Sequence, residues 1–464
     1  MAKVKTSYQC SECGWQSSKW LGQCRNCKAW GTLEETVPAD EPPTSRNKIA
    51  GKTPSHKALP ISEVDIADAR FIPTGIGELD RVLGGGLVAG SVVLLAGEPG
   101  VGKSTLLLDV AGKVASKWKN KSVLYVTGEE SAAQVRLRAE RIGALADNLL
   151  LAAETELENV LGHIDQCSPS LVIADSVQTI ASAQVSGQAG NVTQVRAVCS
   201  ALIEVAKSRG IPVLLVGHVT KSGGIAGPRV LEHLVDVVTQ FEGDRHTRLR
   251  LLRAIKNRYG ATDEVGCFEL VERGIIGLAD PSGLFLSQTS SRGPGTCVTV
   301  TLEGRRPMPT EIQALVSPLV SGGSARRTTS GLDYSRVAMT LAVLQARLRL
   351  ALSQCDVYVS TVGGAKTSEP AVDLAVALAI TSAAQSRPPL EKMVAIGEVS
   401  LTGEIRATVG CGRRLSEAAR LGFRHALIPR LGADEVTAPK GMTLHPVTNL
   451  AEAVMIALPE GEAT

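Results

Sequence analysis

Aromatic side chains are scarce in this chain, where Phe, Trp and Tyr together make up 3% of 464 residues. Glycine is plentiful instead, at 46 residues, so the cores must be packed mainly from Val, Leu, Ile and Ala. Such a composition is typical of layered α/β domains with parallel sheets. At ordinary domain sizes of roughly 100–200 residues, the length predicts two to four domains.

The sequence also lacks any apolar run of about 18 residues or more, the length that a membrane-spanning helix needs. Its first residues, MAKVKTSYQC, carry no apolar leader. We therefore expect a soluble, cytoplasmic protein with no membrane partner. The net charge is only +3, which excludes attraction of polyanions by the whole surface, so any affinity for nucleic acid must come from local basic clusters.

Disulfide bonds are not expected among the ten cysteines, because the cytosol is reducing. Four of them form two CxxC pairs, Cys10 with Cys13 and Cys24 with Cys27. Two such pairs can form the knuckles of a tetrahedral four-thiolate site, the usual structural zinc arrangement, which leaves no open position for catalysis. A segment this short buries little core, so bound Zn²⁺ is expected to supply its folding energy.

Aromatic and basic residues accompany the cysteines. Three tryptophans and three cations lie in this segment: Trp15, Trp20, Trp30, Lys19, Arg25 and Lys28. Such rings and charges suit stacking on bases and contact with phosphates. They suit packing on the knuckles or on a protein partner equally well, so both interpretations stay open.

Composition divides the chain into four parts. Residues 1–33 form the zinc module, and residues 34–68, rich in Pro, Ser, Thr and charge, form a linker. In residues 69–285 the apolar runs SVVLLAG, SVLYVTG, SLVIADS and IPVLLVG alternate with helical stretches, which predicts a doubly wound parallel sheet. Residues 286–464 form a further α/β block.

The segment GEPGVGKST joins a predicted strand to an apolar helix start, the context that makes a phosphate-binding P-loop specific. Its backbone N–H groups and helix dipole hold the phosphates of ATP. Lys103 neutralises the β/γ charge, and the Ser104 hydroxyl is placed to ligate Mg²⁺. The predicted nucleotide-binding residues are Gly97, Glu98, Pro99, Gly100, Val101, Gly102, Lys103, Ser104 and Thr105.

Polar residues also follow three other predicted strands. The predicted strand in LVIADS ends at Asp175, which we interpret as a catalytic Walker B carboxylate acting through water on Mg²⁺. The predicted strand in VLYVTGEES is followed by Glu129 and Glu130, where a carboxylate can deprotonate the attacking water. Acidic residues at the start of a helix also complement its dipole, so this alternative stays open. The predicted strand in IPVLLVGHV ends at His218. This side chain could equally sense the γ-phosphate or be exposed to solvent.

Upstream of the P-loop, the stretch FIPTGIGELDRVLGGGLVAG adds a characteristic pattern of glycines and Leu79-Asp80. Together with the P-loop it resembles the RecA/KaiC superfamily signature. The resemblance implies rings or filaments with ATP at subunit interfaces, and two loops directed toward a central channel. The corresponding segments are SVQTIASAQVSGQAGNVTQVRAV and HVTKSGGIAGPRVLEH, whose small residues also suit ordinary surface loops.

A basic segment, DRHTRLRLLRAIKNRYG, spans residues 244–260. Its alternating TRLRL stretch predicts a strand with one basic face, which is most often a solvated face. Its end is similar to the KNRFG motif of the RadA/Sms family, with Tyr259 in place of Phe. In a ring, Lys256 and Arg258 are then expected to reach the neighbouring subunit's ATP and to act catalytically by stabilising transition-state charge.

The C-terminal block contains SEPAVDLAVALAI and AIGEVSLTGEIRATVGCGRRLSEAARLGF, which resemble the proteolytic domain of Lon. That protease needs a Ser after a Pro in the first segment and a Lys in the second. Here Pro370 is followed by Ala371, and the second segment offers Arg413 and Arg414, which cannot act as the base. We expect a proteolytically inactive domain used for ring assembly and DNA contact. Its candidate phosphate partners are Arg305, Arg306, Arg326, Arg327, Arg347 and Arg349.

Zinc module, ATPase core and Lon-like block occur in the order of the RadA/Sms family, so the resemblance covers nearly the whole chain. It implies a DNA-dependent ATPase of helicase type that acts in homologous recombination and repair on single-stranded and branched DNA. It further implies a hexamer that drives branch migration with the RecA recombinase, using ATP, Mg²⁺ and Zn²⁺. Two alternatives are a KaiC-like signalling ATPase acting on proteins and an ATP-dependent protease, which would need the missing Ser–Lys pair.

Overall fold

The chain forms two compact units, Met1–Asp65 and Ile66–Thr464. Among the helices in the described ranges, none is both long and apolar enough to cross a membrane. The computed structural model describes residues 7–13, 15–17, 19–36, 60–63, 70–218, 231–243, 248–287, 293–319 and 324–459.

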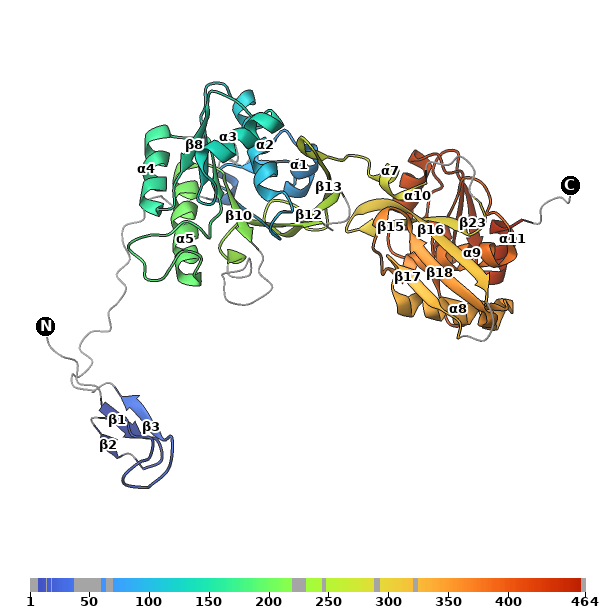
Figure 1. The fold of residues 1–464 in the computed structure, drawn as a ribbon, viewed down its shortest axis with the longest axis horizontal. Helices are drawn as coiled ribbons and strands as arrows, with labels where there is room; N and C mark the ends of the chain where they lie inside the picture. The colour runs from blue at the N-terminus through green and yellow to red at the C-terminus, as the bar shows by residue number, and fades with distance from the viewer. Residues whose placement is uncertain are drawn as a thin grey trace. The chain divides into compact units, whose positions relative to one another are not determined.

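The first unit contains a small antiparallel sheet of β2 (Gln16–Ser17), β1 (Ser7–Cys10) and β3 (Leu33–Thr36), in that order, drawn in dark blue in Figure 1. A short 3₁₀ helix, η1 (Ile61–Glu63), lies further along the chain. The buried core of the sheet consists of Cys10, Cys24 and Leu33, with Tyr8, Trp15 and Leu21 packed against it.

The second unit begins with a nine-stranded sheet. Its strands run parallel from β11 to β8, and the three beyond β11 are antiparallel. In spatial order the strands are β14 (Gly274–Gly277), β13 (Val265–Val271), β12 (Leu249–Asn257), β11 (Val237–Gly243), β6 (Val92–Gly97), β10 (Val213–His218), β9 (Leu171–Asp175), β7 (Val123–Thr127) and β8 (Leu149–Ala153).

Helices cover both faces of this sheet (Figure 1). The central strands β6, β7 and β9 are buried along their whole length, as expected of parallel strands covered on two sides. Two separate hydrophobic clusters result, one containing α1–α3 and the other α4 and α5. The flanking elements are β4 (Phe71–Ile72), α1 (Gly77–Leu83), β5 (Leu87–Val88), α2 (Lys103–Lys117), α3 (Ala132–Ile142), α4 (Leu157–Cys167) and α5 (Val192–Arg209).

The C-terminal region, residues 293–459, is built on a seven-stranded mixed sheet. In spatial order its strands are β17 (Arg327–Ser330), β18 (Cys355–Thr361), β16 (Arg306–Pro318), β15 (Thr296–Glu303), β19 (Met393–Ala395), β22 (His425–Pro429) and β23 (Thr443–Val447). The helix α7 (Ser282–Phe285) precedes it.

Helix α9 (Asp373–Gln385) is the central helix of this region, and its residues 373–382 are all buried. The other elements pack around it and the sheet. They are α8 (Tyr334–Leu348), η3 (Leu352–Gln354), η4 (Val362–Gly364), η5 (Pro370–Val372), β20 (Glu398–Val399), β21 (Ile405–Arg406), α10 (Cys411–Arg420), η6 (Ala433–Glu435) and α11 (Leu450–Ala457).

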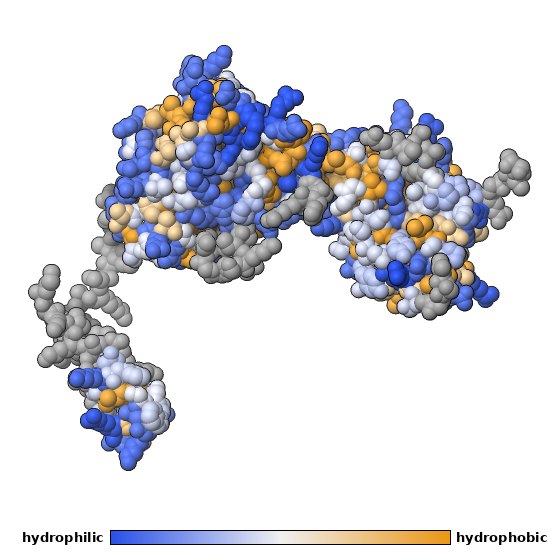
Figure 2. Space-filling model, in the orientation of Figure 1, coloured by the Kyte–Doolittle hydropathy of each residue, from blue (hydrophilic) through white to orange (hydrophobic). Residues whose placement is uncertain are grey.

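The predicted α/β fold class, with a parallel-sheet core and a second α/β block, is confirmed. On the face shown in Figure 2, hydrophilic residues (blue) cover most of the second unit, with apolar residues (orange) in small patches between them. The predicted basic strand forms as β12, but its basic face is solvated only in part. Arg248, just before the strand, is exposed, whereas Arg250 is only 6% exposed. Arg253 lies on the opposite face and pairs with Glu242 and, at 2.6 Å, with Glu303.

Candidate nucleotide and metal sites

The P-loop lies between β6 and α2, at the C-terminal edge of the parallel strands. Gly100 and Gly102 have φ angles of 79° and 110°, in the left-handed region that favours glycine. A Cβ atom on Gly102 would lie 2.2 Å from Cδ1 of Ile275, so the loop needs glycine there for space as well. The loop leads into the N-terminus of α2, whose free N–H groups suit phosphate binding.

Lys103 begins α2 and is only 4% exposed. Its Nζ atom donates to the carbonyl oxygens of Gly97 (2.9 Å) and Glu98 (3.0 Å), and lies 3.3 Å from Nδ1 of His218. Since an ammonium group only donates, Nδ1 accepts, and the opposite ring nitrogen, Nε2, donates to Glu129 Oε1 at 2.8 Å. Burial lowers the pKa of Lys103, against the opposing effect of Asp175 and Glu129.

The two adjacent acids take different positions. Glu129 accepts from His218 and from the Ser176 hydroxyl, and the hydrogen bond from His218 is the main cause that lowers its pKa to about 2. Glu130 instead pairs with Arg138 on α3. The structure therefore brings Glu129 into contact with the Lys103–His218 pair and directs Glu130 away from it.

Asp175 ends β9 and is 6% exposed. The Tyr125 hydroxyl donates to its Oδ2 atom at 2.6 Å. Burial raises the pKa of Asp175, while hydrogen bonds with Tyr125 and Ser104 lower it. The oxygens of Asp175 and Ser104 fit the ligand preference of Mg²⁺. Sequence reasoning missed Tyr125, whose only signal is a single aromatic ring in the otherwise aliphatic strand VLYVT.

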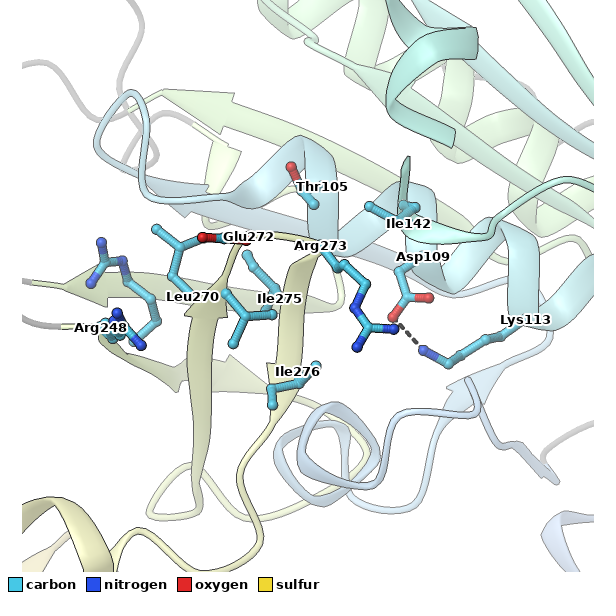
Figure 3. Close-up of a pocket in the computed structure, with 13 residues that line it drawn as sticks. Thr105, Asp109, Lys113, Ile142, Arg248, Leu270, Glu272, Arg273, Ile275 and Ile276 are labelled. Carbon is cyan, nitrogen blue, oxygen red and sulfur yellow. Dashed lines mark hydrogen bonds and ion pairs between the residues drawn. The ribbon is translucent and has the colours of Figure 1, made fainter. Parts of the chain in front are cut away.

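A cavity of about 910 Å³ opens beside Thr105, the last residue of the P-loop segment. Figure 3 shows Thr105, Asp109 and Lys113 lining it from α2. Ile275 and Arg273 line it from the β13–β14 hairpin. The cavity thus combines apolar walls with charged side chains, and it adjoins the phosphate-binding loop.

The KNRYG segment lies away from the P-loop of its own chain. The start of β11, Val237, pairs with Asn257 on one side and with Val93 on the other, whereas Phe241 pairs with Gly97. The segment is therefore at the N-terminal edge of the parallel strands, roughly 13 Å along β6 from the P-loop at 3.3 Å per residue.

Contacts inside the chain hold both KNRYG cations. Lys256 Nζ donates to the carbonyl oxygens of Glu232 (2.8 Å) and Val235 (2.9 Å). Arg258 pairs with Asp236 at 3.1 Å and is 54% exposed. Asp236 also accepts from Lys207 at 2.7 Å and from the Val92 N–H. Sequence reasoning missed Asp236.

The four clustered cysteines meet in the first unit. Sγ of Cys10 lies 3.6 Å from that of Cys27, Cys13 and Cys24 are equally far apart, and all four Sγ atoms lie within 4.8 Å of one another. A disulfide needs about 2.05 Å, whereas sulfurs about 2.3 Å from one tetrahedral zinc ion lie about 3.8 Å apart. The cysteines therefore fit a closed four-thiolate zinc site.

The tryptophans of this unit divide into two groups. Trp15 packs on the cysteine core, and its carbonyl accepts from the Cys10 N–H at 2.9 Å. Trp20 and Trp30 are 60% and 75% exposed, and both rings lie against Gly22. Of the three tryptophans, Trp15 alone packs on the cysteine core, and the interpretation of Trp20 and Trp30 as contacts for bases or a protein partner stays open.

Two candidate phosphate partners in the C-terminal region make contacts inside the chain instead. Arg306 is 8% exposed, and its guanidinium pairs with Glu78 and donates to the carbonyls of Leu278 and Ala279. Arg327 likewise donates to the carbonyl of Leu352 at 2.6 Å. The more accessible candidates are Arg305, Arg326, Arg347 and Arg349.

The positions where Lon carries its dyad are occupied differently here. Ala371 is 2% exposed within a hydrophobic cluster. Arg414 is also 2% exposed and pairs with Glu369 at 2.7 Å. This buried ion pair is a structural contact, and Ala371 supplies no nucleophile.

One buried side chain makes several of the hydrogen bonds that hold the loop after β9. Gln194 of α5, 1% exposed, accepts from the Ser182 N–H and donates to the carbonyls of Ser182, Val185 and Gly187. Most of the second predicted channel loop, residues 219–230, lies outside the described residues.

Three family models match parts of the chain. They are the rubredoxin metal binding domain at residues 8–35, an AAA domain at residues 58–224, and subunit ChlI of Mg-chelatase at residues 335–431. The first match and the geometry of the four cysteines support Zn²⁺, and the second supports ATP.

Curated relatives match over nearly the full length. The DNA repair protein RadA of Mycolicibacterium smegmatis is 52% identical over 462 residues, 98% of this chain and 97% of that protein. The protein of that name from Bacillus subtilis is 43% identical over 459 residues, 99% of this chain and 100% of that protein. A solved KaiC-like protein of Pyrococcus horikoshii is 20% identical, with a TM-score of 0.38 over 45% of this chain and 99% of that one.

Proposed function

Because this chain belongs to the DNA repair protein RadA family, we propose that it is a DNA-dependent ATPase that drives branch migration of recombination intermediates together with RecA. In this proposal it works as a hexameric ring on single-stranded and branched DNA. The observation that carries the ATPase activity is the hydrogen-bonded chain from Lys103 through His218 to Glu129 beside the buried Asp175.

The P-loop residues 97–105 bind the phosphates, with Lys103 on the β/γ charge. Ser104 and Asp175 would hold Mg²⁺, which supplies charge neutralisation at the phosphates when bound. The cavity beside Thr105 takes the nucleoside, since Thr105, the last residue of the P-loop segment, is part of its wall (Figure 3). Glu129 is the carboxylate that orients the attacking water, because it is ionised and lies at 2.8 Å from His218 beside Lys103, where it can accept a hydrogen bond from that water.

Replacing Glu129 by glutamine is expected to lower kcat for ATP hydrolysis on the order of 10²-fold, since a neutral amide is a weaker hydrogen-bond acceptor for the attacking water than a carboxylate. The KM for ATP should change little, because the P-loop contacts remain. The matched variant is Glu130→Gln, which should keep most of the turnover but lower the melting temperature, because Arg138 loses its ion-pair partner. Steady-state kinetics of both variants test this assignment. A larger loss of kcat in Glu130→Gln would show that Glu130 orients the attacking water instead of Glu129.

ATP hydrolysis with and without single-stranded DNA, over a salt series, tests the proposed function. We expect DNA to raise turnover and the stimulation to fall as salt rises, because phosphate contacts release counterions. Exposed Trp20 and Trp30 and the accessible arginines of the C-terminal region are candidate contacts. Turnover indifferent to DNA at every salt concentration would favour the KaiC-like signalling ATPase.

The protease alternative has a separate test. Ala371 and Arg414 leave no Ser–Lys dyad, so a probe directed at active-site serines should not label the protein. Labelling at any serine would reopen proteolysis.

A further inference from the structure

The β15–β16 hairpin of the C-terminal region contacts the segment that follows KNRYG. The Arg305 N–H donates to the carbonyl of Asp263 at 2.6 Å, and the side chains of these two residues pair at 3.4 Å. Gly304, with φ of 62°, is so close that a Cβ atom would lie 2.2 Å from the same carbonyl. The hairpin tip thus rests directly on Asp263, three residues after Gly260.

Arg306 extends this contact into the ATPase core. Its guanidinium pairs with Glu78 of α1 and donates to the carbonyls of Val265 (3.3 Å) and Ala279 (2.8 Å). Glu78 is 5% exposed and also accepts from the Cys267 N–H at 2.9 Å. A buried carboxylate needs a cation to offset its lost hydration, and here Arg306 of the C-terminal region pairs with Glu78 in addition to Arg81 of α1, which lies 3.6 Å away.

Helix α1 holds the other side of the KNRYG segment. An ideal Cβ on Gly260 would lie 3.0 Å from Cα of Gly84, the residue that ends α1. Asn257 donates to the carbonyl of Val82 on the same helix at 3.2 Å. The segment therefore contacts α1, and the hairpin contacts both α1 and the stretch at 263–265 that follows the segment in sequence.

We propose that Gly304, Arg305 and Arg306 are positioning residues, through which the C-terminal region sets the KNRYG segment for its contact with the neighbouring subunit's ATP. The inference rests on the proposed function, in which Lys256 and Arg258 act across a subunit boundary. It assigns the C-terminal region a part in hydrolysis beyond ring assembly and DNA contact.

Gly304→Ala tests the proposal, because its methyl group must push the hairpin tip off Asp263. The matched control is Gly441→Ala, at a glycine of the same region with φ of 80° and open space around its Cβ position. Relative to that control, we expect DNA-stimulated kcat to fall at least about tenfold, with KM for ATP, ring size and melting temperature retained. Equal kcat in the two variants would overturn the proposal.

Mixed rings separate this inference from its premise. Gly304→Ala subunits mixed with Lys103→Ala subunits should recover part of the hydrolysis, as Arg258→Ala subunits should. If Arg258→Ala is rescued and Gly304→Ala is not, the hairpin does not act through KNRYG and this inference alone fails. If Arg258→Ala is not rescued, the inter-subunit premise and this inference both fall. If Gly304→Ala does not fold, Arg305→Ala replaces it in the same kinetic and mixed-ring experiments. That substitution removes only a half-exposed side chain.

Discussion

Lys103→Ala is expected to lower ATP turnover by on the order of 10³-fold or more, since one preorganised donor to developing charge is commonly worth about 10²–10³ and Lys103 also carries a full charge. The side chain joins the P-loop carbonyls of Gly97 and Glu98 to His218. Without it, the β/γ-phosphates lose a buried side-chain cation beside the carboxylates of Asp175 and Glu129. Turnover and binding of a fluorescent ATP analogue measure the loss.

The control for this variant lies on the same helix. Lys117 is in the last turn of α2 and is exposed, so Lys117→Ala should keep its turnover. Zinc content should be equal to wild type in both, because the cysteines belong to the separate first unit. Hydrolysis by Lys103→Ala within tenfold of wild type would show that the P-loop is not the catalytic nucleotide site.

The sequence predicted those features that depend on local order. Strand, glycine turn and helix start are consecutive, so the P-loop could be placed, and the fold class and the resemblance to the RadA/Sms family are confirmed by the sheet and by the full-length relatives. The four cysteines likewise lie close together in sequence. The P-loop and the cysteine pairs each lie within one short stretch of sequence, and the family resemblance adds the order of the modules along the chain.

Features that depend on long-range contacts could not be read in this way. Glu129 and Glu130 are neighbours in sequence, and only the positions of His218 and Arg138 show which one contacts the Lys103–His218 pair. The sequence predicts an accessible Arg306, because its ion-pair partner, Glu78, lies 228 residues away in the chain. A charged residue is usually exposed, but it can be buried when it is paired with an opposite charge.

Arg258→Ala decides whether hydrolysis is shared between subunits. Asp236 keeps Lys207 and the Val92 N–H as partners, so the variant should fold and bind nucleotide. Its position at the N-terminal edge of the sheet places Arg258 far from the P-loop of its own chain. A role as a trans-acting finger predicts a loss of turnover on the order of 10³-fold or more, together with loss of branch migration while DNA binding persists.

Two comparisons make the experiment specific. Lys207→Ala removes the other cation from Asp236, so it should leave turnover nearly intact if Arg258 does more than hold that carboxylate. Arg258→Ala subunits mixed with Lys103→Ala subunits should then regain partial hydrolysis, because some interfaces in mixed rings contain both an intact P-loop and an intact arginine. Mixed rings, confirmed by native mass spectrometry, that hydrolyse no more than the sum of the two inactive proteins would place the action of Arg258 within its own subunit.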